Sequence, residues 1–309
     1  MRKLIFEKIN RSLSFWLTCF SILALTGFIG STLFAQTSDS VNTSQVNKKR
    51  LKAVIIGSSS AYVGSMIGLS KVWYSNYDKQ SFHFFNDASE WKQVDKAGHF
   101  YSAFQLSNIA SRTLQWSNLP KKKSAKIGAI ASFIMMSGIE VLDGFSAGYG
   151  ASASDLFANA AGPAFYLGQN LIWNEVRIYP KFSFHRTDFP AARPDVLGSG
   201  LTQEIIKDYN GQTYWLSIDM DKFISFPKWI NLAVGYGAEE MTYANDAQNR
   251  AIGYDPNRQF YLSLDFDLTA VRAKSKFVRG LIFFANMIKL PGPTVGFSRK
   301  GTKAYALYF

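Results

Sequence analysis

Three pairs of polar side chains lie at helical spacing between Asp95 and Gly162. The pairs are Asp95 with His99, Glu140 with Asp143, and Asp155 with Asn159. Residues three or four apart on a helix share one face, so both members of a pair can point to the same place. The segments around them are apolar, and ionisable groups on apolar faces are costly to bury unless they are paired, hydrogen-bonded or bound to an ion. We therefore expect all six side chains to converge in one buried polar cluster.

Carboxylates and a histidine on facing helices can hold a divalent metal ion or move protons. The candidate metal ligands are Asp95, His99, Glu140, Asp143 and Asp155, and the candidate catalytic residues are these five together with Asn159. Structural roles are also open to the same side chains. Asp155 can cap a helix, Asp143 can bond backbone at a helix end, and Asp95 can orient the histidine or pair with Lys96. We favour a structural polar network, with a bound metal ion or catalysis as the alternative.

The elements that must position these residues are apolar segments of helical period, which predict a bundle of about four helices over residues 53–175. One helix begins near Asp87, whose spacing to Glu90 matches a capping box, and runs to Trp116. A second opens at Ser124 and carries Glu140. A third opens with the capping-box spacing of residues 152–155 and runs toward residue 173. The uncharged segment 53–70 predicts a fourth helix. We favour a helix packed inside the protein or against its β-region over a membrane span, because Ser58, Ser59 and Ser60 make it a weak span.

From Lys181 onward the hydrophobic period changes from helical to alternating. The predicted strands are Thr213–Asp221, a row from Ile230 to Tyr236, Gln259–Leu268, Gly280–Ile288, Thr294–Arg299 and Lys303–Phe309. An apolar face opposite a polar one describes either a sheet lying on helices or a wall that faces lipid. The fold class is therefore α+β, with the bundle followed by an antiparallel β-region over residues 176–309. This region is either a partial barrel or a sheet packed on the helices, because single-chain barrels start at roughly eight strands.

The first 35 residues have the layout of a secretory signal peptide. Basic residues precede an uncharged run from Ser12 to Gln36, and small Ala35 stands before a polar segment. The run is long enough to leave an uncleaved anchor open. Residues 36–52 are polar and predict a loose tether. Cys19 is the single cysteine and lies inside the signal, so the mature chain has no disulfide and no thiolate chemistry.

The chain carries 34 basic and 22 acidic side chains, a formal charge of +12. For an exported protein this favours contact with a membrane or another anionic envelope surface. The sequence contains no nucleic-acid-binding module, so we expect no nucleic acid partner, and it indicates no particular protein partner. The chain ends in Tyr305-Ala306-Leu307-Tyr308-Phe309, similar to the last strand of outer-membrane barrels. These features predict a place in the cell envelope, at the outer membrane or on its periplasmic face.

Three ordered motifs carry a resemblance to known proteins. They are Asp95-Lys96-Ala97-Gly98-His99-Phe100, then Glu140-Val141-Leu142-Asp143-Gly144, then Ser154-Asp155-Leu156-Phe157-Ala158-Asn159-Ala160-Ala161-Gly162. Over about residues 92–168 this set resembles an uncharacterised bacterial family labelled a predicted periplasmic lipoprotein, a domain of unknown function. The motif order D-K-x-x-H, E and D-x-x-x-N-x-x-G is also similar to that of VanZ-like membrane proteins. The residues before Cys19 form a poor lipobox, and a β-rich region follows the matched stretch. The resemblance implies no particular reaction.

Two functions of different classes follow from these observations. The first is an exported cell-envelope protein without catalytic activity, associated with the outer membrane in a structural or assembly role. The second is an envelope hydrolase or transferase that uses the buried histidine–carboxylate site, with or without a metal ion, on a lipid or cell-wall substrate. We favour the first function, and metal analysis of the mature protein separates the two.

Overall fold

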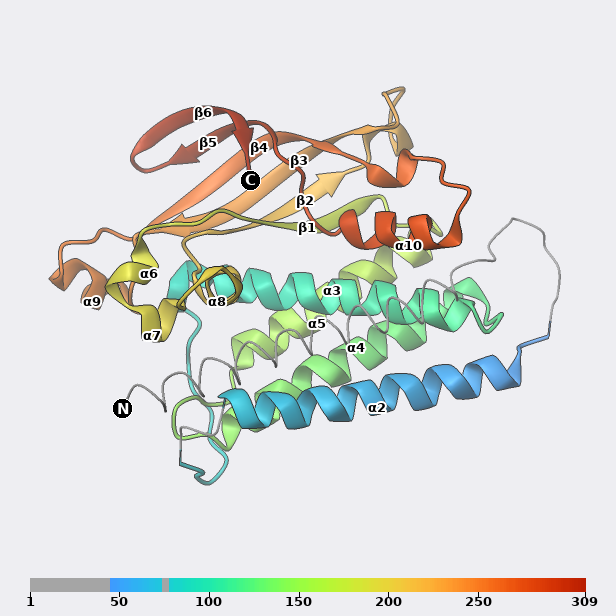
Figure 1. Ribbon diagram of the computed structural model, residues 1–309, viewed down its shortest axis with the longest axis horizontal. Helices are drawn as coiled ribbons and strands as arrows, with labels where there is room; N and C mark the ends of the chain where they lie inside the picture. Colours follow the sequence, from blue (N-terminus) through green and yellow to red (C-terminus); the bar gives the residue numbers. More distant parts are fainter. Residues whose placement is uncertain (1–44, 74–77) are drawn as a thin grey trace.

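The computed structural model describes residues 45–73 and 78–309. The fold is α+β, with the long helices first along the chain and a six-stranded antiparallel sheet after them (Figure 1). The long helices are α2 (Lys48–Trp73), α3 (Val94–Gln115), α4 (Lys121–Gly144) and α5 (Ala153–Ile172), and the 3-10 turn η1 (Glu90–Gln93) leads into α3. The strands are β1 (Ile178–Phe184), β2 (Gln212–Ile218), β3 (Ile230–Glu239), β4 (Asn257–Phe266), β5 (Gly292–Ser298) and β6 (Gly301–Tyr308).

Shorter helices lie between and beside the strands. They are α6 (Phe189–Ala192), α7 (Pro194–Leu197), α8 (Leu201–Lys207), α9 (Asp246–Ala251) and α10 (Lys276–Ala285), with 3-10 turns η2 (Met220–Lys222) and η3 (Leu268–Ala270). The predicted signal peptide, residues 1–35, and the predicted tether as far as residue 44 lie outside the described residues.

Helix α3 lies at the centre of the fold, between the sheet and the other long helices (Figure 1). Two glycines let the helices approach it closely. A Cβ atom on Gly162 of α5 would lie 2.4 Å from the carbonyl oxygen of Phe100, and one on Gly128 of α4 would lie 2.8 Å from that of Ser107. On its other side, Gln105 donates a hydrogen bond of 2.7 Å to the Pro180 carbonyl in β1. Helix α3 therefore joins the bundle to the sheet.

Helix α2 lies on the side of the bundle away from the sheet, and most of its surface is exposed (Figure 1). Val54 packs against Leu114 and Leu119, whereas apolar side chains elsewhere on the helix are more than half exposed, namely Ile55, Ile56, Val63 and Ile67. The prediction that segment 53–70 packs inside the protein or against the β-region is therefore wrong. The segment carries no charge, and its neighbours cover only one side of the helix. The helix also begins at Lys48, so residues 48–52 are helical rather than part of a tether.

Two helices among the described residues are long and apolar enough to cross a membrane, judged by length and composition alone. They are α2, over Lys48–Gly68, and α4, over Lys121–Gly144. Helix α4 also exposes apolar side chains, including Ile130 and Ile134, which are 60% and 59% exposed. The bundle thus has an apolar outer surface in addition to its core.

The sheet follows chain order from β1 to β6, with each strand antiparallel to the next. It curls strongly, because Tyr308 near the end of β6 contacts Trp215 of β2, with ring centroids 6.0 Å apart. Both predicted arrangements hold in part: the sheet curls on itself and also packs on α3. The segment Gly280–Ile288, predicted as a strand, instead contains most of α10. Its buried residues Gly280, Phe283 and Met287 follow a helical period, which a continuous apolar run hides.

The two faces of this sheet differ in polarity. The concave face is buried and largely polar: Lys181 pairs with Asp265 at 2.7 Å, both side chains fully buried, and Ser217 donates to the same carboxylate. Rings also fill this interior, and Gly235 leaves space for the Trp215 indole, which a Cβ atom would approach to 2.6 Å. The convex face carries the large aliphatic residues and the phenylalanines of strands β1 to β5.

The register arranges the convex face in cross-strand rows. One row is aromatic and consists of Phe182, Tyr214, Tyr236, Phe260 and Phe297. The next two rows are almost wholly aliphatic and consist of Pro180, Leu216, Val234, Leu262 and Val295, then Ile178, Ile218, Leu232 and Leu264. Beyond them Trp229 stacks on Phe266, with centroids 6.1 Å apart. The first part of the aromatic row packs on α3, whereas Phe260, Leu262 and Leu264 are 51%, 44% and 42% exposed.

Candidate functional site

The polar cluster forms where three helices end together beneath the sheet. The first turns of α3 bring Asp95 and His99, the last turn of α4 brings Glu140, and the start of α5 brings Asp155 and Asn159. Ser152 caps α5, because its hydroxyl accepts a hydrogen bond from the Asp155 N–H as the capping-box spacing predicts. Five of the six predicted residues therefore lie in one place.

His99 lies at the centre of the cluster with its ring held by Asn159. Its Nδ1 lies 3.0 Å from the amide oxygen of Asn159, so Nδ1 carries the proton and donates it. The same amide directs its nitrogen toward Glu140 at 3.5 Å, which is consistent with this orientation. The other ring nitrogen, Nε2, lies 3.8 Å from Asp95 and 3.9 Å from Asp155. These distances are too long for hydrogen bonds.

Glu140 is buried, with 2% of its surface exposed, and joins α4 to α5. One carboxylate oxygen accepts the Ser152 N–H at 3.1 Å, and the other lies 3.8 Å from Nδ1 of His99. Asp143, predicted as its partner, lies one turn farther along α4 and is half-buried. The Asp143 charge contributes to raising the pKa of Glu140, so Asp143 influences the cluster from its edge.

Lys96 pairs with three carboxylates of the cluster. Its ammonium lies 2.6 Å from Asp87, 2.7 Å from Asp155 and 3.1 Å from Asp95. The contact with Asp155 Oδ1 is an ion pair without hydrogen-bond geometry, and this buried oxygen accepts no hydrogen bond. Three carboxylates from three segments therefore share one ammonium group.

Two cluster residues were not predicted from the sequence. Asp87 was interpreted as a helix cap, but its carboxylate accepts hydrogen bonds from the hydroxyls of Ser152 and Ser154 and pairs with Lys96. Tyr209, from the β-region, donates its hydroxyl to Asp95 at 2.8 Å. Gly98 makes room for a second tyrosine of the β-region, because a Cβ atom there would lie 2.8 Å from the Tyr214 hydroxyl. The β-region thus closes the cluster that the helices form.

The segment that carries this cluster also matches a known family. Residues 83–169 match the family described as Predicted periplasmic lipoprotein (DUF2279). The matched region includes every cluster residue of α3, α4 and α5, together with Asp87, and it supports a location in the cell envelope or periplasm. Likeness to VanZ-like proteins is not shown by this match. No curated protein and no solved structure matches the chain.

Burial and mutual repulsion set the protonation of the carboxylates in the matched region. Burial, with the Asp155 and Asp143 charges, raises the pKa of Glu140 to about 7. Burial and the Asp95 charge raise the pKa of Asp155 to about 6, against the opposing effects of His99 and Lys96. Asp87 differs, because hydrogen bonds from Lys96, Ser152 and Ser154 outweigh its burial and lower its pKa to about 2.

The carboxylates of the cluster raise the pKa values of both cations, His99 and Lys96. Burial opposes the charge on His99, but the carboxylates of Asp95, Asp155 and Glu140 outweigh it and raise the His99 pKa. Burial likewise opposes the charge on Lys96, and its carboxylate partners outweigh it and raise the Lys96 pKa. The cluster therefore favours the protonated forms of His99 and Lys96.

Asp95, His99 and Asp155 could also hold a metal ion. One ligand atom from each lies within 4.8 Å of the other two, and the Asn159 hydrogen bond leaves Nε2 of His99 as the coordinating nitrogen. Carboxylate oxygen and imidazole nitrogen suit Zn²⁺ or a similar first-row divalent ion. The Lys96 ammonium already neutralises two of these carboxylates, which disfavours an added cation.

Proposed function

We propose that this chain is an outer-membrane-associated envelope protein with a structural or assembly role, whose sheet contacts lipid through its convex face. The difference in polarity between the two faces of the sheet carries the proposal. A polar interior beneath an apolar outer face is the pattern of strands that face hydrocarbon. In water the same face would leave Leu262, Leu264 and Phe260 without a partner surface.

The order of the rows supports lipid as the partner. Aromatic side chains gather where membrane proteins meet the headgroup region, and aliphatic side chains occupy the hydrocarbon between them. On β4 the aromatic positions Phe260 and Phe266 stand six residues apart along the strand. This corresponds to about 20 Å, which approaches the height of an outer-membrane apolar band.

In this proposal the polar cluster has a structural role. It ties α3, α4 and α5 together at the end where the β-region contributes Tyr209, and Lys96 balances the carboxylates that burial brings together. A buried network whose members are partnered fixes one arrangement of the elements.

Membrane fractionation of cells that produce the full chain tests the proposal. Leu262→Arg places a charge in the middle of the aliphatic band, which costs about 2–4 kcal/mol on a lipid-facing strand. We expect this variant to lose its recovery in the outer-membrane fraction. Leu201→Arg is the matched control, because Leu201 is 52% exposed on α8 and lies outside the sheet. Recovery of the unmodified chain in the soluble periplasmic fraction would contradict the proposal.

A second candidate function is a metal-dependent envelope hydrolase or transferase. The position of His99 Nε2 between Asp95 and Asp155, at 3.8 and 3.9 Å, is the observation that favours it. A bound divalent ion would polarise a substrate or lower the pKa of a water molecule. Glu140 would hold or move a proton beside it. Elemental analysis of the purified mature protein decides: one equivalent of metal that is lost in His99→Ala supports this function, and its absence supports the structural one.

A further inference from the structure

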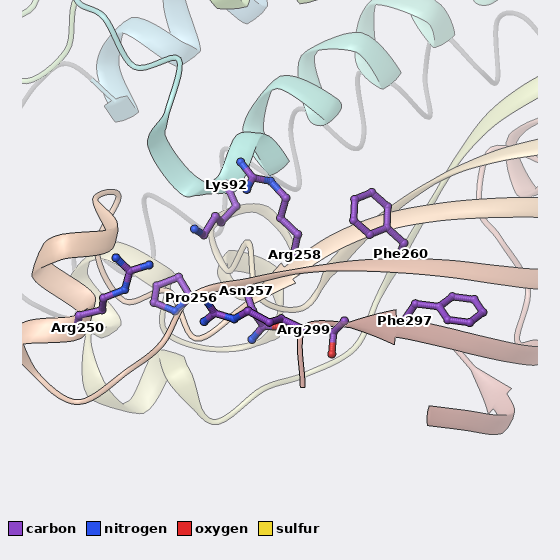
Figure 2. A pocket seen from close by; sticks show the side chains of 9 residues that line it. Lys92, Arg250, Pro256, Asn257, Arg258, Phe260, Phe297 and Arg299 are labelled. Carbon is purple, nitrogen blue, oxygen red and sulfur yellow. The ribbon is translucent and has the colours of Figure 1, made fainter. Parts of the chain in front are cut away.

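A basic pocket lies at the end of the strands, beside the aromatic row. It encloses about 360 Å³ and is lined by Lys92, Arg250, Pro256, Asn257, Arg258, Phe260, Phe297, Ser298 and Arg299. Figure 2 shows the cationic side chains coming from η1, α9, β4 and the turn after β5, with both phenylalanine rings farther along the strands. Segments far apart in the chain thus bring four cations to one place.

The acidic side chains around this pocket do not balance its cations. Lys92 and Arg250 share Asp246, and Arg250 and Arg299 share Asp255. Arg258 has no carboxylate partner among the described residues, and its guanidinium donates to the amide oxygen of Gln93. The neighbouring Glu240 is paired with Lys300, which does not line the pocket. The four lining cations therefore face two carboxylates, which leaves the pocket with positive charge available for an anion.

The backbone beside the pocket is held in an unfavourable conformation. Trp91, Lys92 and Gln93 have φ angles of +47°, +52° and +64°, which residues other than glycine rarely adopt. Such strain persists where surrounding contacts enforce it and gathers at binding sites. Here the Tyr236 hydroxyl donates to the Lys92 carbonyl, and the Trp91 N–H donates to the Ala244 carbonyl at 3.0 Å. The turn places Lys92 in the pocket wall and Gln93 against Arg258.

We infer that this pocket binds the phosphate headgroup of an anionic phospholipid. Guanidinium groups suit phosphate because they donate two parallel hydrogen bonds. Phe260 and Phe297 line the pocket and also belong to the aromatic row. The acyl chains of a lipid whose phosphate is held by Arg258 would therefore lie against the aromatic and aliphatic rows of the convex face. The inference rests on the proposed lipid contact and adds headgroup selectivity to it.

Vesicle flotation with the purified mature chain tests the inference. Vesicles of phosphatidylcholine alone are compared with vesicles in which about one lipid in three is phosphatidylglycerol, an anionic phospholipid. We expect tighter binding to the anionic vesicles, and Arg258→Gln should weaken this preference about fivefold, the effect of one cation near an anionic surface. Arg258→Lys keeps the charge and should retain most of the preference. Lys122→Gln, which removes one exposed charge from the start of α4, is the matched control.

Each outcome has a separate meaning. Equal losses for Arg258→Gln and Lys122→Gln, with unchanged melting temperatures, would show a diffuse charge effect and overturn the site. Saturable binding of inorganic phosphate without a preference for anionic vesicles would make it a free-anion site and overturn the lipid assignment. Failure of the unmodified chain to bind neutral vesicles concerns the convex face instead, and so tests the proposed function rather than the pocket.

Discussion

Lys96 lies within 3.1 Å of Asp87, Asp95 and Asp155, and this contact set favours a structural cluster over a metal centre. A metal site keeps its carboxylates for the ion. Here the Lys96 ammonium already pairs with these carboxylates. Glu140 accepts the Ser152 N–H and lies 3.8 Å from His99. The residue contacts therefore support a network that joins helices.

Glu140 gives the first stability prediction. Replacement by Ala removes the acceptor of the Ser152 N–H and of the Asn159 amide, and leaves both donors buried. We expect Glu140→Ala to lower the free energy of unfolding by about 1–3 kcal/mol in urea unfolding. Unchanged or increased stability would instead indicate strain stored for chemistry.

The Glu140 pKa gives a pH prediction with a definite sign. Burial raises this pKa from 4.5 to about 7, so the folded protein binds a proton more tightly than the unfolded chain. Between these pH values folding takes up a proton, and stability falls as the pH rises. Glu140→Gln retains an acceptor but cannot titrate. Thermal melts from pH 4.5 to 7 should show a smaller decline for this variant than for the unmodified protein, and an identical decline would contradict the assignment.

Sequence reasoning located the cluster residues that lie on regular helices, since spacing of three or four places side chains on one face. It did not identify Asp87 and Tyr209 as members. Asp87 bonds to Ser152 and Ser154, 65 and 67 residues away, and Tyr209 reaches Asp95 across 114 residues. No local pattern encodes such contacts, because they depend on how the helices and the sheet pack.

At the scale of the elements, close helix approach depends on particular glycines. Gly162→Ala should cost about 1–3 kcal/mol, because the added methyl group would meet the backbone of α3. Gly168 is the control on the same helix: nothing lies within 4 Å of a Cβ atom there, so Gly168→Ala should be neutral or stabilising by up to about 1 kcal/mol. Equal effects of the two substitutions on urea unfolding would show that α3 and α5 are not held this closely.

The buried pair inside the sheet provides a second prediction at this scale. Lys181→Met would leave the fully buried Asp265 without its close cation, which typically costs about 3–5 kcal/mol. The double variant Lys181→Met with Asp265→Leu removes both charges and should recover most of that loss. If the double variant unfolds as easily as the single one, the charge of Asp265 is not the cause.

The alternation of the strands was predicted from the sequence, but the side that faces inward was not. A period of two places apolar and polar residues on opposite faces whichever face is buried. Only the curl of the sheet, with Tyr308 against Trp215, shows that the polar residues fill the interior. For α10, the apolar run was interpreted as a strand, because a short apolar run fits both a helix and a strand when no clear period stands out.

In the whole molecule, exposed apolar side chains lie on two surfaces: the convex face of β4 and the outer sides of α2 and α4. A chain with a formal charge of +12 combines these surfaces with a basic pocket at one end of the apolar band. Apolar surfaces beside clustered cations are the arrangement expected of a protein that meets an anionic bilayer. These surfaces therefore support contact of the convex face with lipid.

Spin labelling along β4 measures whether the convex face contacts lipid. Single cysteines at Phe260, Leu262, Leu264 and Phe266, in a Cys19→Ser background, place nitroxides along the convex face. In the vesicle-bound protein, labels at 262 and 264 should collide frequently with oxygen and rarely with a water-soluble nickel chelate, and labels at 260 and 266 should be intermediate. A label at Leu201 should stay accessible to the chelate. If all four β4 labels are as accessible to the chelate as the label at residue 201, the convex face lies in water and the account is contradicted.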